Sequence, residues 1–126
     1  MATRILVVED NPLNLKLVRD VLEFRGFEVA TAATGEEGVT MALSDPPHLV
    51  LMDLQLPGID GHEALQRIRA DRRCDGVPVV AVTAFAMSTD IDRASAAGFD
   101  GYIAKPIDIR NLPAQLAVYL DGHGDV

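Results

Sequence analysis

Acidic, hydroxyl and amino side chains directly follow apolar runs at four places in this sequence. They are Glu9 and Asp10 after Ile5–Val8, Asp53 after Leu49–Met52, Thr83 after Val79–Val82, and Lys105 after Tyr102–Ala104. If these runs are neighbouring parallel strands, their carboxyl ends meet at one edge of a sheet, where open α/β sheets bind ligands. Three carboxylates gathered there repel one another unless a cation lies between them, and Mg²⁺ prefers oxygen ligands. The pattern therefore predicts a metal-dependent phosphoryl site.

Each of these side chains also has an ordinary interpretation when it is considered alone. Asp53 can be a nucleophile toward phosphorus or the first residue of a turn. Glu9 and Asp10 can hold Mg²⁺ or be the solvated acidic start of a helix. Lys105 and Thr83 can contact phosphoryl oxygens or be exposed strand-end residues. All four strand ends carry a group that a phosphoryl site needs, and this agreement favours the functional interpretation.

The composition limits the classes of protein to consider. A chain of 126 residues fits one domain with a single core. Its 19 acidic and 11 basic residues give a net charge of -8, which disfavours binding to nucleic acid. The single cysteine, Cys74, is expected in an exposed loop and indicates a reducing cytoplasm. No apolar segment has the pattern of a signal peptide or the length of a membrane span, so we expect neither secretion nor membrane insertion.

Strand-length apolar runs alternate five times with amphipathic, helix-length stretches. This alternation predicts an α/β fold with a parallel sheet covered on both faces. The expected strands are 4–8, 27–32, 49–53, 79–83 and 101–105, and the expected helices are 12–25, 35–44, 62–70, 88–98 and 109–120. We expect one domain over residues 1–121 and a short C-terminal tail over 122–126.

The first helix has clear boundary signals. Asn11 is a suitable N-cap, and Pro12 is favourable at the first helical position. Gly26 is expected to end the helix. Apolar residues recur between them at helical spacing, namely Leu13, Leu17, Val21 and Phe24.

As an ordered set, these motifs resemble the receiver domains of bacterial response regulators in two-component signalling. The resemblance covers nearly the whole chain. It rests on ILVVEDN at 5–11, LMD at 51–53, LPGIDG at 56–61, VTA at 82–84 and YIAKP at 102–106. EDNPLN at 9–14 and TAFAM at 83–87 are most similar to single-domain DivK-type regulators and to the receivers of hybrid kinases.

The resemblance implies a flavodoxin-like doubly wound (βα)5 sandwich, with a five-stranded parallel sheet in the order 2-1-3-4-5. It implies that Asp53 accepts a phosphoryl group from a phosphohistidine on a sensor histidine kinase or histidine phosphotransferase. The cofactor implied is Mg²⁺, for which Mn²⁺ can substitute. Its implied ligands are Asp10, Asp53, the backbone carbonyl of Gln55 and, through water, Glu9. Thr83 and Lys105 would contact the phosphoryl oxygens, and the bond between Lys105 and Pro106 would be cis.

The resemblance also implies a switch. A phosphoryl group on Asp53 attracts the Thr83 hydroxyl, and Tyr102 then turns from solvent toward the core. This changes the face made by the fourth helix, fifth strand and fifth helix, where a downstream protein would bind; its candidate residues are Ala94, Ala97, Tyr102, Ala104 and Leu112. The family further implies that Gln55 and Phe85 modulate the phosphoryl lifetime. We expect a monomer, or a weak dimer on phosphorylation.

The leading interpretation is a signalling protein whose catalysis is limited to its own phosphotransfer and slow autodephosphorylation. One alternative is a small phosphatase that forms an aspartyl phosphate on Asp53. Gln55 argues against it, because haloacid-dehalogenase-like phosphatases have a second Asp at that position. The sequence is also compatible with a receiver excised from a larger hybrid kinase and with an interaction module that ignores phosphate.

Overall fold

Five parallel strands form the centre of the structure, a computed structural model that describes residues 3–84, 93 and 96–124. The strands are β1 (Arg4–Val8), β2 (Glu28–Ala32), β3 (Leu49–Asp53), β4 (Val79–Thr83) and β5 (Gly101–Ala104). Their order in the sheet is β2-β1-β3-β4-β5, and every neighbouring pair is parallel. The predicted fold class and strand order are confirmed.

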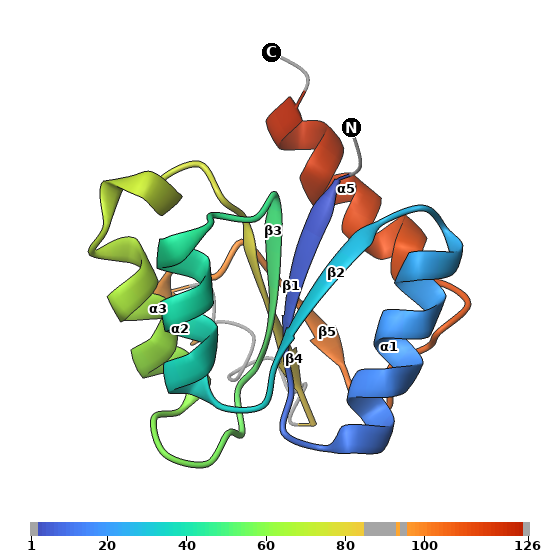
Figure 1. Ribbon diagram of the computed structural model, residues 1–126, viewed down its shortest axis with the longest axis horizontal. Coiled ribbons are helices and arrows are strands. Elements are labelled where there is room, and N and C mark those ends of the chain that lie inside the picture. The colour runs from blue at the N-terminus through green and yellow to red at the C-terminus, as the bar shows by residue number, and fades with distance from the viewer. Residues whose placement is uncertain (1–2, 85–92, 94–95, 125–126) are drawn as a thin grey trace.

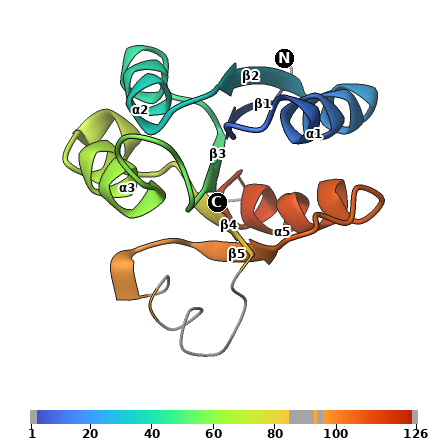
Figure 2. The same cartoon turned by 90° about the horizontal axis from the view of Figure 1, so that it is seen from below.

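Helices cover both faces of this sheet. They are α1 (Pro12–Phe24), α2 (Gly35–Ser44), α3 (Gly61–Arg69) and α5 (Leu112–Gly124), and a short 3₁₀ helix, η1 (Arg72–Cys74), follows α3. Figures 1 and 2 show α1 and α5 on one face and α2 and α3 on the other. The helix expected over residues 88–98 falls mostly outside the described residues.

Successive residues of the central strands enter two different cores, because side chains alternate across a pleated strand. Leu6 and Met52 pack in the core beneath α2 and α3, whereas Val7 and Leu51 pack in the core beneath α1 and α5. All five residues of β3 and all five of β4 are buried. This double burial explains why the two strands are continuous apolar runs rather than alternating ones.

Side-chain caps fix the start of three helices, close to the strand ends. The Asn11 side chain accepts hydrogen bonds from the backbone N–H groups of Leu13 and Asn14, as the sequence predicted. Thr34 and Asp60 cap α2 and α3 in the same way. Each cap satisfies backbone donors that the first helical turn leaves without partners.

The apolar stripe that predicted α1 is not the buried side of this helix. Val18 and Leu22 face the core, whereas Leu13 is 65% exposed and Phe24 is 86% exposed. Helical spacing identifies a stripe but does not say whether the sheet lies beneath it. In α1 a second set of apolar residues, which includes Leu15, supplies the side that packs on the sheet.

The boundaries of α5 also differ from the prediction. The helix begins at Leu112 rather than at Ile109, because Asp108 forms a turn in which its carboxylate accepts a hydrogen bond from the N–H of Arg110. Leu112 is fully buried and therefore does not belong to a binding face. The helix continues to Gly124, so residues 122–124 are helical rather than part of a tail. Gly122 has a low helix propensity, but propensity alone does not end a helix.

Cys74 was expected in an exposed loop and is instead buried. It lies at the end of η1, where its thiol contacts the backbone carbonyl of Ala42 in α2 at 3.4 Å. The neighbouring Arg72 and Arg73 are exposed, so the tight turn separates charged and apolar side chains. In the described part of the chain, no helix has the length and apolar character needed to cross a membrane.

The orientation of α1 gives a direct stability test. Leu22→Ala removes a fully buried side chain and should lower the free energy of unfolding by about 2–5 kcal/mol. Leu13→Ala, on the exposed side of the same helix, should change it by less than about 0.5 kcal/mol. Urea unfolding at low protein concentration measures both values. Equal losses in the two variants would show that the assigned orientation of α1 is wrong.

Candidate functional site

The register of the sheet places the strand-end residues side by side. Val8 of β1 pairs with Met52 of β3, so that Glu9 and Asp53 follow at the same level. Asp53 in turn pairs with Val82 of β4, which puts Thr83 one residue beyond it. Thr83 pairs with Ala104 of β5, and Lys105 comes next. Four parallel strands therefore deliver their polar ends to one edge, as the sequence predicted.

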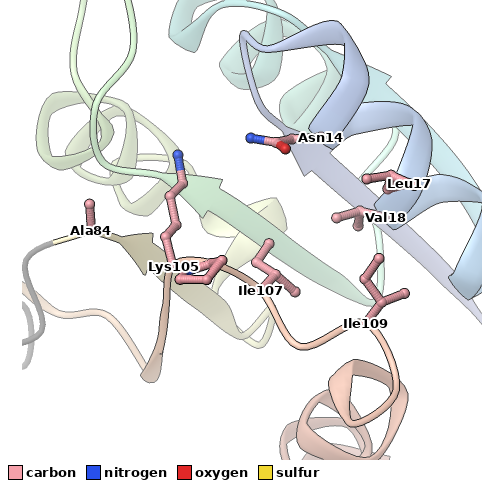
Figure 3. A pocket seen from close by; sticks show the side chains of 8 residues that line it. Asn14, Leu17, Val18, Ala84, Lys105, Ile107 and Ile109 are labelled. Carbon is pink, nitrogen blue, oxygen red and sulfur yellow. The ribbon is translucent and has the colours of Figure 1, made fainter.

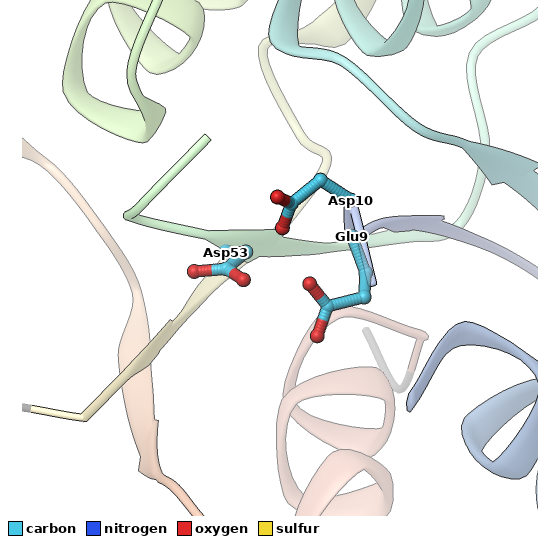
Figure 4. A group of neighbouring side chains, drawn as sticks. All are labelled: Glu9, Asp10 and Asp53. Atoms are coloured by element: carbon cyan, nitrogen blue, oxygen red, sulfur yellow. The ribbon is translucent and has the colours of Figure 1, made fainter. Parts of the chain in front are cut away.

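Three carboxylates meet at this edge. One oxygen from each of Glu9, Asp10 and Asp53 lies within 4.8 Å of the others, and Figure 4 shows the three side chains grouped at the strand ends. Glu9 is 5% exposed and Asp53 2% exposed, whereas Asp10 is open to solvent. Because the two buried carboxylates have lost most of their hydration, the cluster needs positive charge.

Lys105, which directly follows β5, provides part of that positive charge. Its ammonium nitrogen lies 2.6 Å from Asp53 Oδ2 and 3.7 Å from Glu9 Oε1. Partial burial by itself lowers the pKa of Lys105. The hydrogen bond to Asp53 and the attraction of Asp53, Glu9 and Asp10 outweigh that effect and raise its pKa above the ordinary value. Lys105 is therefore held in its charged form.

The environment of the cluster raises the pKa of Glu9. Burial is the largest cause that raises its pKa, and a hydrogen bond to Asp53 and repulsion by the Asp53 charge add to it. The Asn11 N–H, 3.3 Å from Glu9 Oε2, and the charge of Lys105 act in the opposite direction. The net result is a pKa of about 7, so Glu9 carries a proton for part of the time near neutral pH.

Backbone groups fix the position of Asp53. The N–H of Gln55 donates a hydrogen bond to Asp53 Oδ1 at 2.9 Å, and the N–H of Leu54 donates to the carbonyl of Val82 at 3.0 Å. A side chain at Gly61 would place its Cβ 2.7 Å from the carbonyl oxygen of Asp53. Glycine at this position lets the start of α3 approach the end of β3 closely.

The remaining predicted residues that the structure describes lie on, or directly after, β4 and β5. Thr83 is buried, and its carbonyl accepts a hydrogen bond from the N–H of Lys105 at 2.8 Å. The bond between Lys105 and Pro106 is cis. Tyr102 is exposed on β5. Phe85 lies outside the described residues.

The sequence interpretation missed a groove beside Lys105. It has a volume of about 470 Å³ and lies between α1 and the segment that joins β5 to α5 (Figure 3). Its lining residues are Asn14, Leu17, Val18, Ala84, Lys105, Pro106, Ile107 and Ile109. The one available signal was the apolar pair Ile107 and Ile109 directly after Lys105 and Pro106.

Chemically, the site combines a buried carboxylate, an adjacent ammonium group and two further carboxylates. Oxygen ligands of this kind suit Mg²⁺, which needs few protein ligands because it keeps several of its waters. Glu9, Asp10 and Asp53 could hold such an ion. The same groups suit phosphoryl transfer, which depends on positioning and on neutralising negative charge.

Comparisons with known proteins agree with this geometry. Residues 5–117 match the family described as "Response regulator receiver domain". The polar-differentiation response regulators DivK of Brucella ovis and Brucella anthropi are each 39% identical over 120 residues, which cover 95% of this chain and 98% of theirs.

The chain is also similar to solved structures of receiver domains. A CheY-like response regulator receiver domain protein from Methanospirillum hungatei superposes with a TM-score of 0.90 at 33% identity, covering 98% of both chains. The receiver domain of the sensor histidine kinase PA1611 from Pseudomonas aeruginosa superposes with a TM-score of 0.87 at 34% identity, covering 95% of this chain and 98% of that one. That structure has a magnesium ion coordinated in its active-site cleft.

The raised pKa of Glu9 predicts how stability depends on pH without added metal. The folded protein binds a proton on Glu9 more tightly than the unfolded chain, whose ordinary value is 4.5. This contribution is fully present below pH 4.5 and is lost as the pH rises through about 7. Glu9→Gln should therefore be more stable than the wild type at pH 8, by roughly 1–3 kcal/mol. Urea unfolding at pH 5 and pH 8 measures this, and equal pH dependence in the two proteins would contradict it.

Proposed function

The chain belongs to the response regulator receiver domain family, and from this we propose that it is a phosphorylation-controlled signalling protein. Asp53 accepts a phosphoryl group from a phosphohistidine on a sensor histidine kinase or histidine phosphotransferase. The observation that carries the proposal is the setting of Asp53. It is buried at a strand end, bound to Lys105 through one oxygen and to the Gln55 N–H through the other.

The proposed reaction moves one phosphoryl group between two proteins. A carboxylate oxygen of Asp53 forms a bond to phosphorus while the bond from phosphorus to the donor imidazole nitrogen breaks. The imidazole nitrogen keeps the electron pair of the broken bond. The protein holds the nucleophile at the end of a rigid strand, and this positioning is the main requirement of phosphoryl transfer.

The remaining residues neutralise the charge that gathers around the transferred group. Lys105 already lies beside Asp53 and contacts a phosphoryl oxygen, while the Thr83 hydroxyl donates to another. When bound, Mg²⁺ supplies further neutralisation, held by Asp10, Asp53 and the Gln55 carbonyl, with Glu9 acting through water. Mn²⁺ can substitute for it. The magnesium-bound receiver of PA1611 supports this assignment by similarity.

The proposed output is a change of surface rather than turnover of a substrate. The added charge on Asp53 draws the Thr83 hydroxyl toward it, and the exposed Tyr102 turns inward. A downstream protein binds the altered face around β5 and α5, and the chain is a monomer or a weak dimer when phosphorylated. The DivK relatives, which are named response regulators, support a single-domain regulator of this kind. We propose that it acts in the bacterial cytoplasm.

Exposure to acetyl phosphate with Mg²⁺ tests the proposal directly. We expect a mass increase of one phosphoryl group on Asp53, located by peptide mapping. The label should be absent in Asp53→Asn and in wild type treated with a chelator. Asp60→Asn is the matched control, because Asp60 lies in the following loop and asparagine also caps helices well.

The control variant should label as fully as the wild type. A folded wild-type protein that never acquires the label, or one that labels equally when Asp53 is replaced, would refute the assignment of Asp53.

A further inference from the structure

Two separate segments of the chain carry the carboxylate cluster. Glu9 and Asp10 directly follow β1, whereas Asp53 ends β3 and Gln55 lies in the loop that leads from β3 to α3. Figure 4 shows Glu9 and Asp10 on one segment and Asp53 on the other. The spacing of the possible metal ligands therefore depends on the contacts that hold these two segments relative to each other.

Hydrogen bonds hold the two ends of the loop after β3. The N–H of Leu54 donates to the carbonyl of Val82 at 3.0 Å, and the N–H of Gly61, at the start of α3, donates to the carbonyl of Leu54 at 3.2 Å. Residues 55–60 lie between these points, and the start of α2 packs on them. Figure 1 shows the start of α2 and this loop at the same end of the sheet.

The contact between α2 and the loop is close. A Cβ at Gly35 would lie 2.6 Å from Ile59 Cγ1 and 2.7 Å from the Ile59 carbonyl oxygen. A Cβ at Gly58 would lie 2.6 Å from Glu36 Oε2. Gly35 is buried, and the Ile59 side chain packs against the core beneath α2 and α3. Two successive residues of α2 therefore contact two successive residues of the loop.

The same region also contacts the segment that begins at Glu9. The N–H of Glu9 donates to the carbonyl of Ala32, the last residue of β2, at 3.0 Å. In the first turns of α2, a Cβ at Gly38 would lie 2.7 Å from Cγ2 of Val8, which directly precedes Glu9. The end of β2 and the start of α2 thus contact both segments that carry the cluster.

Side chains fix the start of α2 itself. Thr34 Oγ1 accepts a hydrogen bond from the N–H of Glu37 at 3.1 Å, and Glu37 Oε1 accepts one from the N–H of Ala33 at 3.2 Å. This reciprocal pair resembles a capping box, which satisfies backbone donors at a helix start. It holds the connection between β2 and α2 in one conformation, so this connection can impose a fixed spacing on its two neighbours.

We propose that Gly35 is a positioning residue of the metal site. Through Gly35, the start of α2 sets the spacing between the segment of Glu9 and Asp10 and the loop that contains Gln55. A side chain at position 35 forces the Ile59 backbone to shift, because a carbonyl oxygen cannot rotate aside as a flexible side chain can. The inference rests on the proposed function, in which the Gln55 carbonyl and the carboxylates hold Mg²⁺.

Calorimetric titration with Mg²⁺ tests the role of Gly35. Gly35→Ala should weaken Mg²⁺ binding by about tenfold, the lower end of the range for residues that orient metal ligands. Ile59→Ala removes the other side of the same contact without adding atoms, and it should also weaken binding. Ile59→Val keeps Cγ1, which makes the closest approach to Gly35, and should bind Mg²⁺ as the wild type does.

Two control variants separate positioning from general destabilisation. Gly76→Ala adds a methyl group where the described part of the structure leaves open space, and it should not change Mg²⁺ affinity. Leu22→Ala weakens the other core, beneath α1 and α5, and should leave the affinity of the folded protein unchanged. Urea unfolding without metal establishes that each variant is folded. An affinity that falls as much in Leu22→Ala as in Gly35→Ala would overturn the proposal.

Unchanged Mg²⁺ affinity in Gly35→Ala would also overturn it, and if that variant does not fold, unchanged affinity in Ile59→Ala would do so. Acetyl phosphate should label Asp53 of Gly35→Ala to the wild-type extent once Mg²⁺ is saturating, because Asp53 and Lys105 are unaltered. Labelling that stays incomplete would contradict a role confined to metal binding.

The titrations also distinguish this proposal from the proposed function. A wild type that binds no Mg²⁺ would refute the metal site of the proposed function and this inference with it. A wild type that binds Mg²⁺ and labels on Asp53, with Gly35→Ala and Ile59→Ala binding equally well, would refute the role of Gly35 alone.

Discussion

The contact between Lys105 and Asp53 is the interaction on which the site depends. A carboxylate that is only 2% exposed is costly to keep charged without a positive partner. The partner comes from β5, which is separated from β3 by β4, so the pair forms only when three strands are in register. The contact therefore links the chemistry of the site to correct assembly of the sheet. It also leaves the other two carboxylates, Glu9 and Asp10, only partly neutralised.

Much of this edge could be predicted from the sequence. Apolar runs such as Leu49–Met52 are long enough for strands and too short for most helices, and each ends in a polar residue. Parallel strands bring their carboxyl ends to one edge of the sheet, wherever the helices between them begin and end. The predicted sheet order and the grouping of Glu9, Asp53 and Lys105 followed from these facts together with the resemblance to receiver domains.

Other features depend on tertiary neighbours and could not be predicted in this way. The periodicity of α1 located the helix, but two apolar stripes compete for the sheet, and only packing shows that Val18 and Leu22 face inward. Cys74 lies in a polar segment, yet the 3₁₀ turn directs it beneath α2. The raised pKa of Glu9 likewise arises from burial and from Asp53, neither of which is visible in the local sequence. The groove beside Lys105 joins residues about ninety positions apart in the chain.

The central claim is that Glu9, Asp10 and Asp53 form one charge-coupled site that a divalent cation completes. Calorimetric titration with Mg²⁺ at pH 7, in two buffers that differ in ionisation enthalpy, tests it most directly. We expect one ion per chain, together with release of part of a proton, because the cation displaces the proton that Glu9, with its pKa of about 7, carries for part of the time. Asp10→Asn should weaken binding strongly. Unchanged affinity in Asp10→Asn, or binding without proton release, would contradict the account.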